Sequence, residues 1–151
     1  MSEHDAAGVD AIIRVAIYET LVERGVAPTR AELAHATGLA ANAVATSMAR
    51  LAAAHVLVLD DAGDVRMAMP FSAVPTAFRV RSGDRAWWAN CAWDALGIAA
   101  ATECDIAITT ECPDCGAPLT LGVRNGALQS SEGVAHFAVP AAHWWDDIGY
   151  T

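Results

Sequence analysis

The spacing of apolar residues predicts three helices in the first third of the chain. Over residues 10–25 apolar side chains recur three and four positions apart, which is typical of a helix, and Gly25 marks its end. Thr29 and Glu32 match the capping box that opens a helix, so a second, short helix is expected after Thr29. A third helix is expected over residues 41–54, with its larger apolar side chains on one face.

Alternation of apolar and polar residues replaces helical spacing over residues 55–70, on either side of the turn sequence DDAGD. This pattern predicts a two-stranded hairpin. Three helices followed by such a hairpin are the elements of a winged helix-turn-helix unit, which we expect at residues 1–70.

The charge of this N-terminal unit disfavours binding to nucleic acid. Residues 1–70 hold five arginines and nine acidic residues, a net charge of −4, and the whole chain carries −9. DNA binding rests on cations that neutralise phosphates. We therefore favour a packing and substrate-covering role for the unit. The alternative is a small DNA-binding regulator whose second half senses a metal or a thiol.

Residues 71–151 combine short strands with one central helix. We expect a strand that ends at the turn Ser82-Gly83-Asp84, and then a helix over residues 84–102 with Asp84 as its N-cap. Further strands are expected within 104–113, 117–126 and 126–140, and a short helix within 141–151. The expected fold class is α+β: the winged-helix unit packed on a domain with a small mixed or antiparallel sheet and helices.

Composition indicates a folded protein that does not enter the membrane. Hydrophobic residues make up 54% of the chain and charged residues 18%, which is typical of a globular domain. No apolar run reaches the roughly 18–20 residues that a membrane-spanning helix needs. The stretch MSEHDAAGVD at the N-terminus is polar and acidic, unlike a secretory signal, so we expect a cytoplasmic protein.

All four cysteines lie in the second half, at Cys91, Cys104, Cys112 and Cys115. In a cytosolic chain such a cluster indicates metal or thiol chemistry rather than disulfides. Cys112 and Cys115 form a Cys-x-x-Cys-Gly turn, in which two thiolates can meet one metal ion. A closed zinc site needs two further ligands, and no second Cys-x-x-Cys is present, so zinc is not favoured. A redox dithiol and ordinary thiols stay open as alternatives.

The run WWANCAWDALGIAAA, residues 87–101, places Cys91 and Asp94 three positions apart in apolar surroundings. On a helix that spacing puts thiol and carboxylate on one face. A carboxylate is costly to bury there unless it is paired, bound or used. The alternative is a buried cysteine beside a carboxylate that caps a loop. Trp88 and His136 stand in apolar runs and are expected in the core or in the wall of a pocket.

Residues 85–123, RAWWANCAWDALGIAAATECDIAITTECPDCGAPLTLGV, resemble the central segment of the organomercurial (alkylmercury) lyases. The family's Cys-x-x-Asp after an alanine fits Ala89, Cys91 and Asp94. Its Cys-x-x-x-Gly-Ala-Pro turn fits the stretch that begins at Cys112, to which this chain adds Cys115. The stretch HFAVPAAHWW, residues 136–145, resembles the family's His-Phe and Val-Pro segment.

The resemblance implies a fold, a substrate and roles for two residues. It implies a winged-helix-like unit on a catalytic domain, in which Cys91 captures the mercury of a small organomercurial, or of another soft thiol-seeking substrate. Asp94 then takes up the thiol proton and delivers it to carbon, which cleaves the carbon–mercury bond. Thiolates are the softest ligands that a protein offers, which suits mercury. Mercury enters as part of the substrate, and no resident cofactor is implied.

This chain is expected to be a short, divergent member, because the family's second mercury-binding cysteine is missing. The family has that cysteine just before the stretch at His136, where this chain reads SSEG, residues 130–133. Cys115 or Cys104 could take the role of that cysteine if the fold brings either close to Cys91, and external thiols could supply the missing sulfur. Cys112 matches a family cysteine that the resemblance makes structural. Cys112 and Cys115 are nevertheless kept as candidates for holding mercury or zinc. We also place Glu132 near the expected pocket. The alternatives are other lyase or proton-transfer chemistry on a biosynthetic intermediate, and a non-catalytic, cysteine-rich metal-binding protein.

Overall fold

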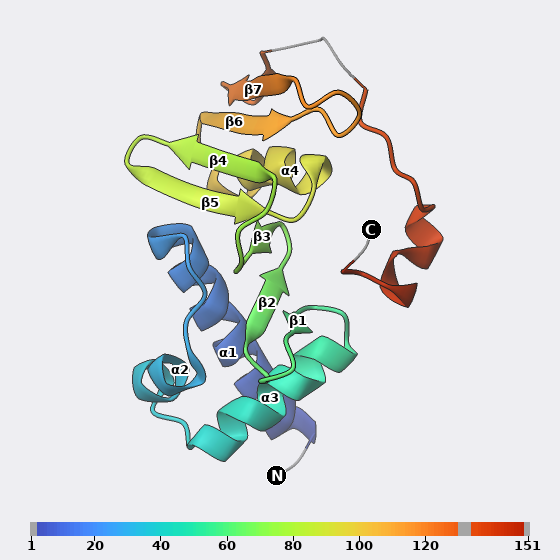
Figure 1. The fold of residues 1–151 in the computed structure, drawn as a ribbon. Coiled ribbons are helices and arrows are strands. Elements are labelled where there is room, and N and C mark those ends of the chain that lie inside the picture. The colour runs from blue at the N-terminus through green and yellow to red at the C-terminus, as the bar shows by residue number, and fades with distance from the viewer. Residues whose placement is uncertain (1–2, 130–133, 150–151) are drawn as a thin grey trace.

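The structure, a computed structural model, describes residues 3–129 and 134–149 (Figure 1). Its helices are α1 (Glu3–Arg24), α2 (Arg30–Thr37), α3 (Ala41–Ala53), α4 (Ala92–Thr102) and the 3-10 helix η1 (Ala141–Asp146). Its strands are β1 (Val58–Leu59), β2 (Val65–Ala68), β3 (Phe71–Ser72), β4 (Phe78–Ser82), β5 (Arg85–Ala89), β6 (Ile106–Glu111), β7 (Pro118–Arg124) and β8 (Ala127–Leu128). None of the described helices is long and apolar enough to cross a bilayer.

Local sequence signals account for the three N-terminal helices. Gly25, at φ +69°, ends α1 and donates its N–H to Leu21 O at 2.9 Å. The expected capping box opens α2: Glu32 N donates to Thr29 Oγ1 at 3.2 Å, and Thr29 N donates to Glu32 Oε2 at 2.8 Å. The bond from Thr29 N to the Glu32 carboxylate, with those from the Arg24 side chain and Thr29 Oγ1, lowers the pKa of Glu32 to about 2.

The eight strands form one sheet in the order β1-β2-β3-β5-β4-β6-β7-β8, and every described pair is antiparallel. The α+β class is confirmed, with an antiparallel sheet. β3 pairs with β2 on one side and β5 on the other, so the expected β1–β2 hairpin continues into the larger sheet. The sheet therefore crosses the boundary that the sequence suggests near residue 70.

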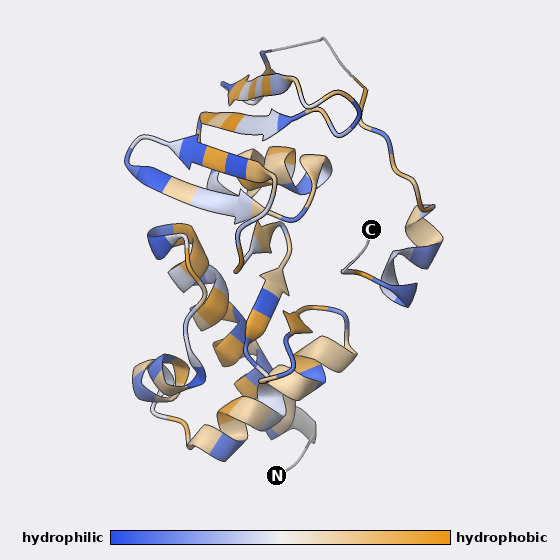
Figure 2. Cartoon of the chain, in the orientation of Figure 1, coloured by the Kyte–Doolittle hydropathy of each residue, from blue (hydrophilic) through white to orange (hydrophobic). Residues whose placement is uncertain are grey.

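The core joins the N-terminal helices to this sheet. The C-terminal end of α1 lies against β5, and α4 packs against β3, β4 and β5 (Figure 1). Trp87 of β5 is 1% exposed and donates its indole N–H to Leu21 O at 2.9 Å. Leu21 O also accepts the N–H of Gly25, and the same indole N–H lies 3.2 Å from Val22 O. Since the last carbonyls of a helix lack partners within the helix, the contact with Val22 O satisfies one of them, and the indole fixes α1 on the sheet. Figure 2 shows orange hydrophobic segments along α1.

The helix expected over residues 84–102 is wrong in its first part. Residues 85–89 form β5, which pairs with both β3 and β4, and the helix begins only at Ala92. Gly83, at φ +56°, turns the chain back so that β5 completes a hairpin with β4. Asp84 therefore does not cap the helix, and Cys91 is its N-cap.

The strand expected over residues 126–140 is also mostly absent. Ala127 and Leu128 pair with β7 as β8, residues 130–133 lie outside the described residues, and residues 134–140 form no strand. The short helix expected near the C-terminal end is present as η1. The ring of Trp145 in η1 stacks on His55 after α3, with centroids 4.0 Å apart and planes 7° from parallel. This contact holds the C-terminal segment against the N-terminal helices.

Candidate functional site

The step from β5 into α4 brings Cys91 and Asp94 together. Cys91 is the N-cap of α4 in an extended conformation, φ −148° and ψ −179°, and its Sγ accepts the N–H of Asp94 at 3.4 Å. Asp94 is the third residue of the helix, the position whose side chain faces back to the cap. The two side chains are neighbours as expected, although they meet at the start of the helix rather than inside it.

Asn90 holds the carboxylate of Asp94 in place. Its Nδ2 donates to Asp94 Oδ2 at 3.0 Å and to Phe71 O of β3 at 3.3 Å. Its Oδ1 is buried and has no hydrogen-bond partner among the described residues. Sequence reasoning missed Asn90, and the available signal was an amide directly before the cysteine in an otherwise apolar run.

Burial sets the proton affinity of both groups. It raises the pKa of Asp94 above its ordinary value, and hydrogen bonds from Asn90 and Cys91 act in the opposite direction. Burial also raises the pKa of the Cys91 thiol, and the nearby carboxylate of Asp94 raises it further. The hydrogen bond from the N–H of Asp94 lowers it in part. At neutral pH Cys91 therefore carries its proton, and Asp94 is a stronger proton acceptor than an exposed aspartate.

Cys91 lines two adjoining cavities. The smaller, about 60 Å³, also contacts Asp94, Asn90 and Met69. The larger, about 210 Å³, is lined by Phe78, Ala92, residues 135–139 and Trp144.

The C-terminal segment covers both cavities. Phe137 and Trp144 line the two of them, with ring centroids 5.4 Å apart. Trp144 Nε1 donates to Val139 O at 2.8 Å, which holds this cover in shape. The site thus has a thiol and a carboxyl group at its floor and aromatic rings above them.

The remaining residues expected at the site are placed differently. His136 lines the larger cavity with Cys91. Trp88 lines neither cavity: its ring lies under the guanidinium of Arg79 at 4.3 Å, and it points to the sheet face opposite Trp87. Glu132 lies outside the described residues.

The other three cysteines are free and line neither cavity at Cys91. Cys104 follows the far end of α4, whose 11 residues span about 16 Å. Cys112 and Cys115 lie in the turn after β6, where N–H groups of Cys115 and Asp114 lower the pKa of Cys112. Among the described residues no group of three or more His, Cys, Asp or Glu is arranged to hold a metal ion.

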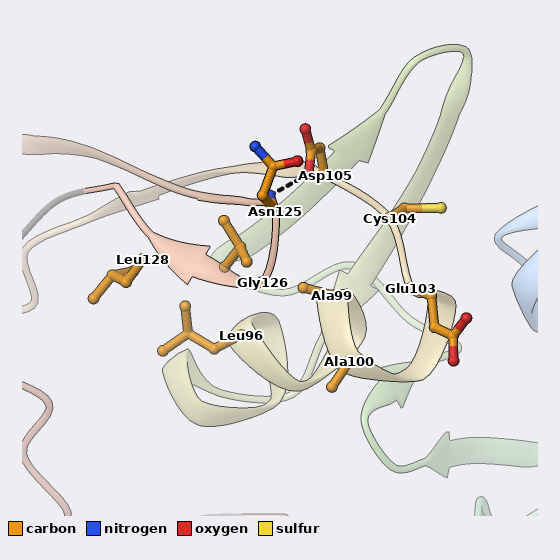
Figure 3. Close-up of a pocket in the computed structure, with 10 residues that line it drawn as sticks. Leu96, Ala99, Ala100, Glu103, Cys104, Asp105, Asn125, Gly126 and Leu128 are labelled. Carbon is orange, nitrogen blue, oxygen red and sulfur yellow. Dashed lines mark hydrogen bonds between the residues drawn. The ribbon is translucent and has the colours of Figure 1, made fainter.

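A larger cavity of about 640 Å³ lies between α4 and the β7–β8 turn (Figure 3). It also holds a thiol near carboxyl groups, at Glu103, Cys104 and Asp105, and Leu96, Ala99 and Leu128 make its walls apolar (Figure 3). Cys104 Sγ accepts from Arg85 at 3.1 Å and donates to Thr102 O at 3.1 Å, and Asp105 Oδ1 accepts the N–H of Asn125 at 2.8 Å. At Cys91 the thiol and the carboxyl group of Asp94 interact directly, and we place the candidate site there.

Comparisons with known proteins match this part of the chain. A family model described as alkylmercury lyase matches residues 71–151, a range that contains Cys91 and Asp94. A solved structure, the mercury-bound form of MerB2, aligns with a TM-score of 0.62 and 25% sequence identity, over 85% of this chain and 67% of that one. No curated protein matches the sequence.

Proposed function

The chain belongs to the alkylmercury lyase family, and on that premise we propose that it captures an organomercurial on Cys91 and cleaves the carbon–mercury bond with a proton from Asp94. The observation that carries this proposal is the pairing of Cys91 and Asp94 at the start of α4, where both side chains line one cavity. The aromatic cover of Phe137 and Trp144 gives the organic group of the substrate an apolar environment.

Capture begins with a thiol that still holds its proton. Sulfur is a soft ligand and mercury a soft metal, so the sulfur–mercury bond forms at Cys91 as its S–H bond breaks. The bond from mercury to the halide or small thiolate that it carried breaks, and this ligand leaves as an anion. The proton passes to the neighbouring carboxylate of Asp94, whose pKa is raised by burial and which therefore accepts it readily. The N–H of Asp94 continues to donate to the mercury-bound sulfur.

Cleavage returns that proton to the carbon. The carboxyl group of Asp94 donates its proton, a carbon–hydrogen bond forms, the carbon–mercury bond breaks, and Asp94 becomes a carboxylate again. Mercury needs a second thiolate to release the carbon, and none of the other cysteines lines the cavities at Cys91. An external thiol fills that position: it binds mercury as a thiolate and loses its proton to solvent.

Capture is tested by intact-protein mass spectrometry with one equivalent of phenylmercury. All proteins in this test carry Cys112→Ser/Cys115→Ser, which removes the other reachable thiols. This parent protein and the control with Cys104→Ser should carry one phenylmercury adduct per chain after a short exposure with a monothiol present. Cys91→Ser should not, because an alcohol is a poor ligand for a soft metal. An undiminished adduct on Cys91→Ser would move capture to another cysteine and refute the proposal.

Turnover is tested by the release of benzene from phenylmercury. We expect slow release by the protein alone and a rate that increases with added monothiol, since the thiol supplies the second sulfur. Rapid multiple turnover without any added thiol would contradict this role of the external thiol. No release at any thiol concentration would indicate that the pocket acts on a different substrate.

A further inference from the structure

The turn between β6 and β7 gathers two cysteines that the proposed reaction does not use. Cys112 N donates to Ala117 O at 2.8 Å, and Gly116 N donates to Cys112 O at 2.9 Å. Gly116 adopts φ +70°, a conformation that suits glycine and lets the chain turn back at once into β7. These bonds fix the backbone on both sides of the sequence Cys-Pro-Asp-Cys.

The two cysteine side chains of this turn lie near each other and can be reached from solvent. Cys112 and Cys115 are three residues apart in one tight turn, which the bond from Gly116 N to Cys112 O closes at 2.9 Å. The N–H groups of Cys115 and Asp114 and the side chain of Cys115 lower the pKa of Cys112. Cys115 is exposed and Cys112 half-buried, so a small ion reaches both from solvent.

The number of side chains that can bind a metal at this turn indicates which metal ion it suits. Among the described residues, no third His, Cys, Asp or Glu is arranged with the two cysteines to hold a metal ion. Zinc takes four ligands in a structural site, which two cysteines do not provide. Mercuric ion is soft and is satisfied by two thiolates, and this turn offers two thiols.

The turn also lies at the same end of the sheet as Cys91. Phe78 pairs with Ala89 of β5, and the β4–β6 register places Thr110 on its other side. Cys91 comes two residues after Ala89, and Cys112 comes two residues after Thr110. In the sheet, β4 lies between β5, which leads to Cys91, and β6, which leads to Cys112. Strands two positions apart are separated by about 10 Å. Cys91 and the turn therefore lie at the same end of the sheet, on nearby segments.

We propose that Cys112 and Cys115 form a second mercury site, which binds inorganic Hg²⁺ as a two-coordinate dithiolate. Two S–H bonds break, two S–Hg bonds form, and two protons pass to solvent. Binding of added Hg²⁺ at this turn is independent of any cleavage at Cys91. Its use as the acceptor of the mercury that cleavage frees rests on the proposed function.

The test uses the variant Cys91→Ser/Cys104→Ser, in which Cys112 and Cys115 are the remaining cysteines. With Hg²⁺ and an excess of 2-mercaptoethanol, native mass spectrometry should find one mercury per chain, with a mass that reflects the loss of two protons. Adding Cys115→Ser should weaken retention by about 10²–10⁴-fold, because the second thiolate binds at high effective concentration. Adding Asp114→Asn is the matched control and should leave retention unchanged, since its N–H and not its carboxylate contacts sulfur.

Three results would overturn the proposal. The first is mercury stripped from the two-cysteine variant by the monothiol, and the second is equal retention after Cys115→Ser. Circular dichroism of each variant verifies that it is folded. The variant should retain no Zn²⁺ under the same conditions, and stoichiometric zinc would also refute a two-coordinate site. Because Hg²⁺ is added directly and Cys91 is absent, failure of phenylmercury cleavage leaves this result unaffected.

Discussion

Replacing Asn90 with alanine removes the amide that donates to the carboxylate of Asp94 at 3.0 Å. A hydrogen bond to a charged group contributes about 1.5–3 kcal/mol. Asp94 is only partly enclosed, so we take the lower end and expect Asn90→Ala to reduce the free energy of unfolding by about 1.5–2 kcal/mol at pH 7. For a chain of this size that corresponds to a fall in Tm of roughly 3–8 °C.

The same substitution should act differently at acid pH. Burial raises the pKa of Asp94 above its ordinary value of 3.8, so the ionised carboxylate is less favourable in the folded protein than in the unfolded chain. The free energy of unfolding therefore falls as pH rises from 3.8 through the pKa of Asp94 in the folded protein. Without Asn90 the ionised form loses a donor, and the pKa of Asp94 rises further. The destabilisation by Asn90→Ala should therefore be largest at neutral pH and should shrink once Asp94 is protonated. The lost bond to Phe71 O leaves a part that does not change with pH.

Urea unfolding of wild type and Asn90→Ala, measured from pH 4 to pH 8, provides the assay. Asn42→Ala is the matched control: Asn42 is exposed on α3, and its replacement should change stability by less than about 0.5 kcal/mol at every pH. In an Asp94→Asn background the pH-dependent part of the Asn90 effect should vanish. A difference between wild type and Asn90→Ala that is constant with pH, or that persists with Asp94→Asn, would refute the reasoning.

Four further predictions concern Gly25, Thr29, the thiol of Cys91 and the cover formed by Trp144. Gly25→Ala should destabilise the protein by more than about 2 kcal/mol in thermal unfolding, because φ is +69° and a Cβ would lie 2.0 Å from Ala86 O; a neutral effect would contradict this packing. Thr29→Ala should cost about 1 kcal/mol through loss of the capping box, and an unchanged Tm would refute that role. Alkylation of Cys91 by iodoacetamide, followed in Cys104→Ser/Cys112→Ser/Cys115→Ser, should have its midpoint above pH 9.0, since burial raises the pKa of the thiol. Adding Trp144→Ala to this variant should accelerate the alkylation of Cys91, because it uncovers the cavity. Equal alkylation rates with and without Trp144→Ala would argue against a covering role for Trp144.

Sequence was sufficient where a local signal fixes the structure. The capping box at Thr29 and the glycine at the end of α1 act within one turn of helix, so their positions could be read directly. The prediction that Cys91 lies beside Asp94 is confirmed although the predicted start of the helix is wrong. An N-cap residue and the third residue of its helix are neighbours, as are two residues one turn apart within a helix.

Sequence was insufficient where pairing between distant segments decides. Trp87 and Trp88 stand in an apolar run that fits a buried helix and a buried strand equally well. Pairing with β3 and β4 makes it a strand, and the alternation then buries Trp87 and turns Trp88 away from the site. In the same way, residues 134–140 have strand-like composition, yet they pack over Cys91 without a strand partner.

The central claim is that Asp94 delivers the proton to carbon, and a single-turnover measurement tests it most directly. Wild type and Asp94→Asn are each loaded with one equivalent of phenylmercury, mixed with excess monothiol in D₂O, and sampled for benzene by gas chromatography and mass spectrometry. The account predicts that both proteins hold the adduct, and that wild type releases singly deuterated benzene. Asp94→Asn should release it about 10²–10⁴-fold more slowly. Release from Asp94→Asn at the wild-type rate would contradict the account.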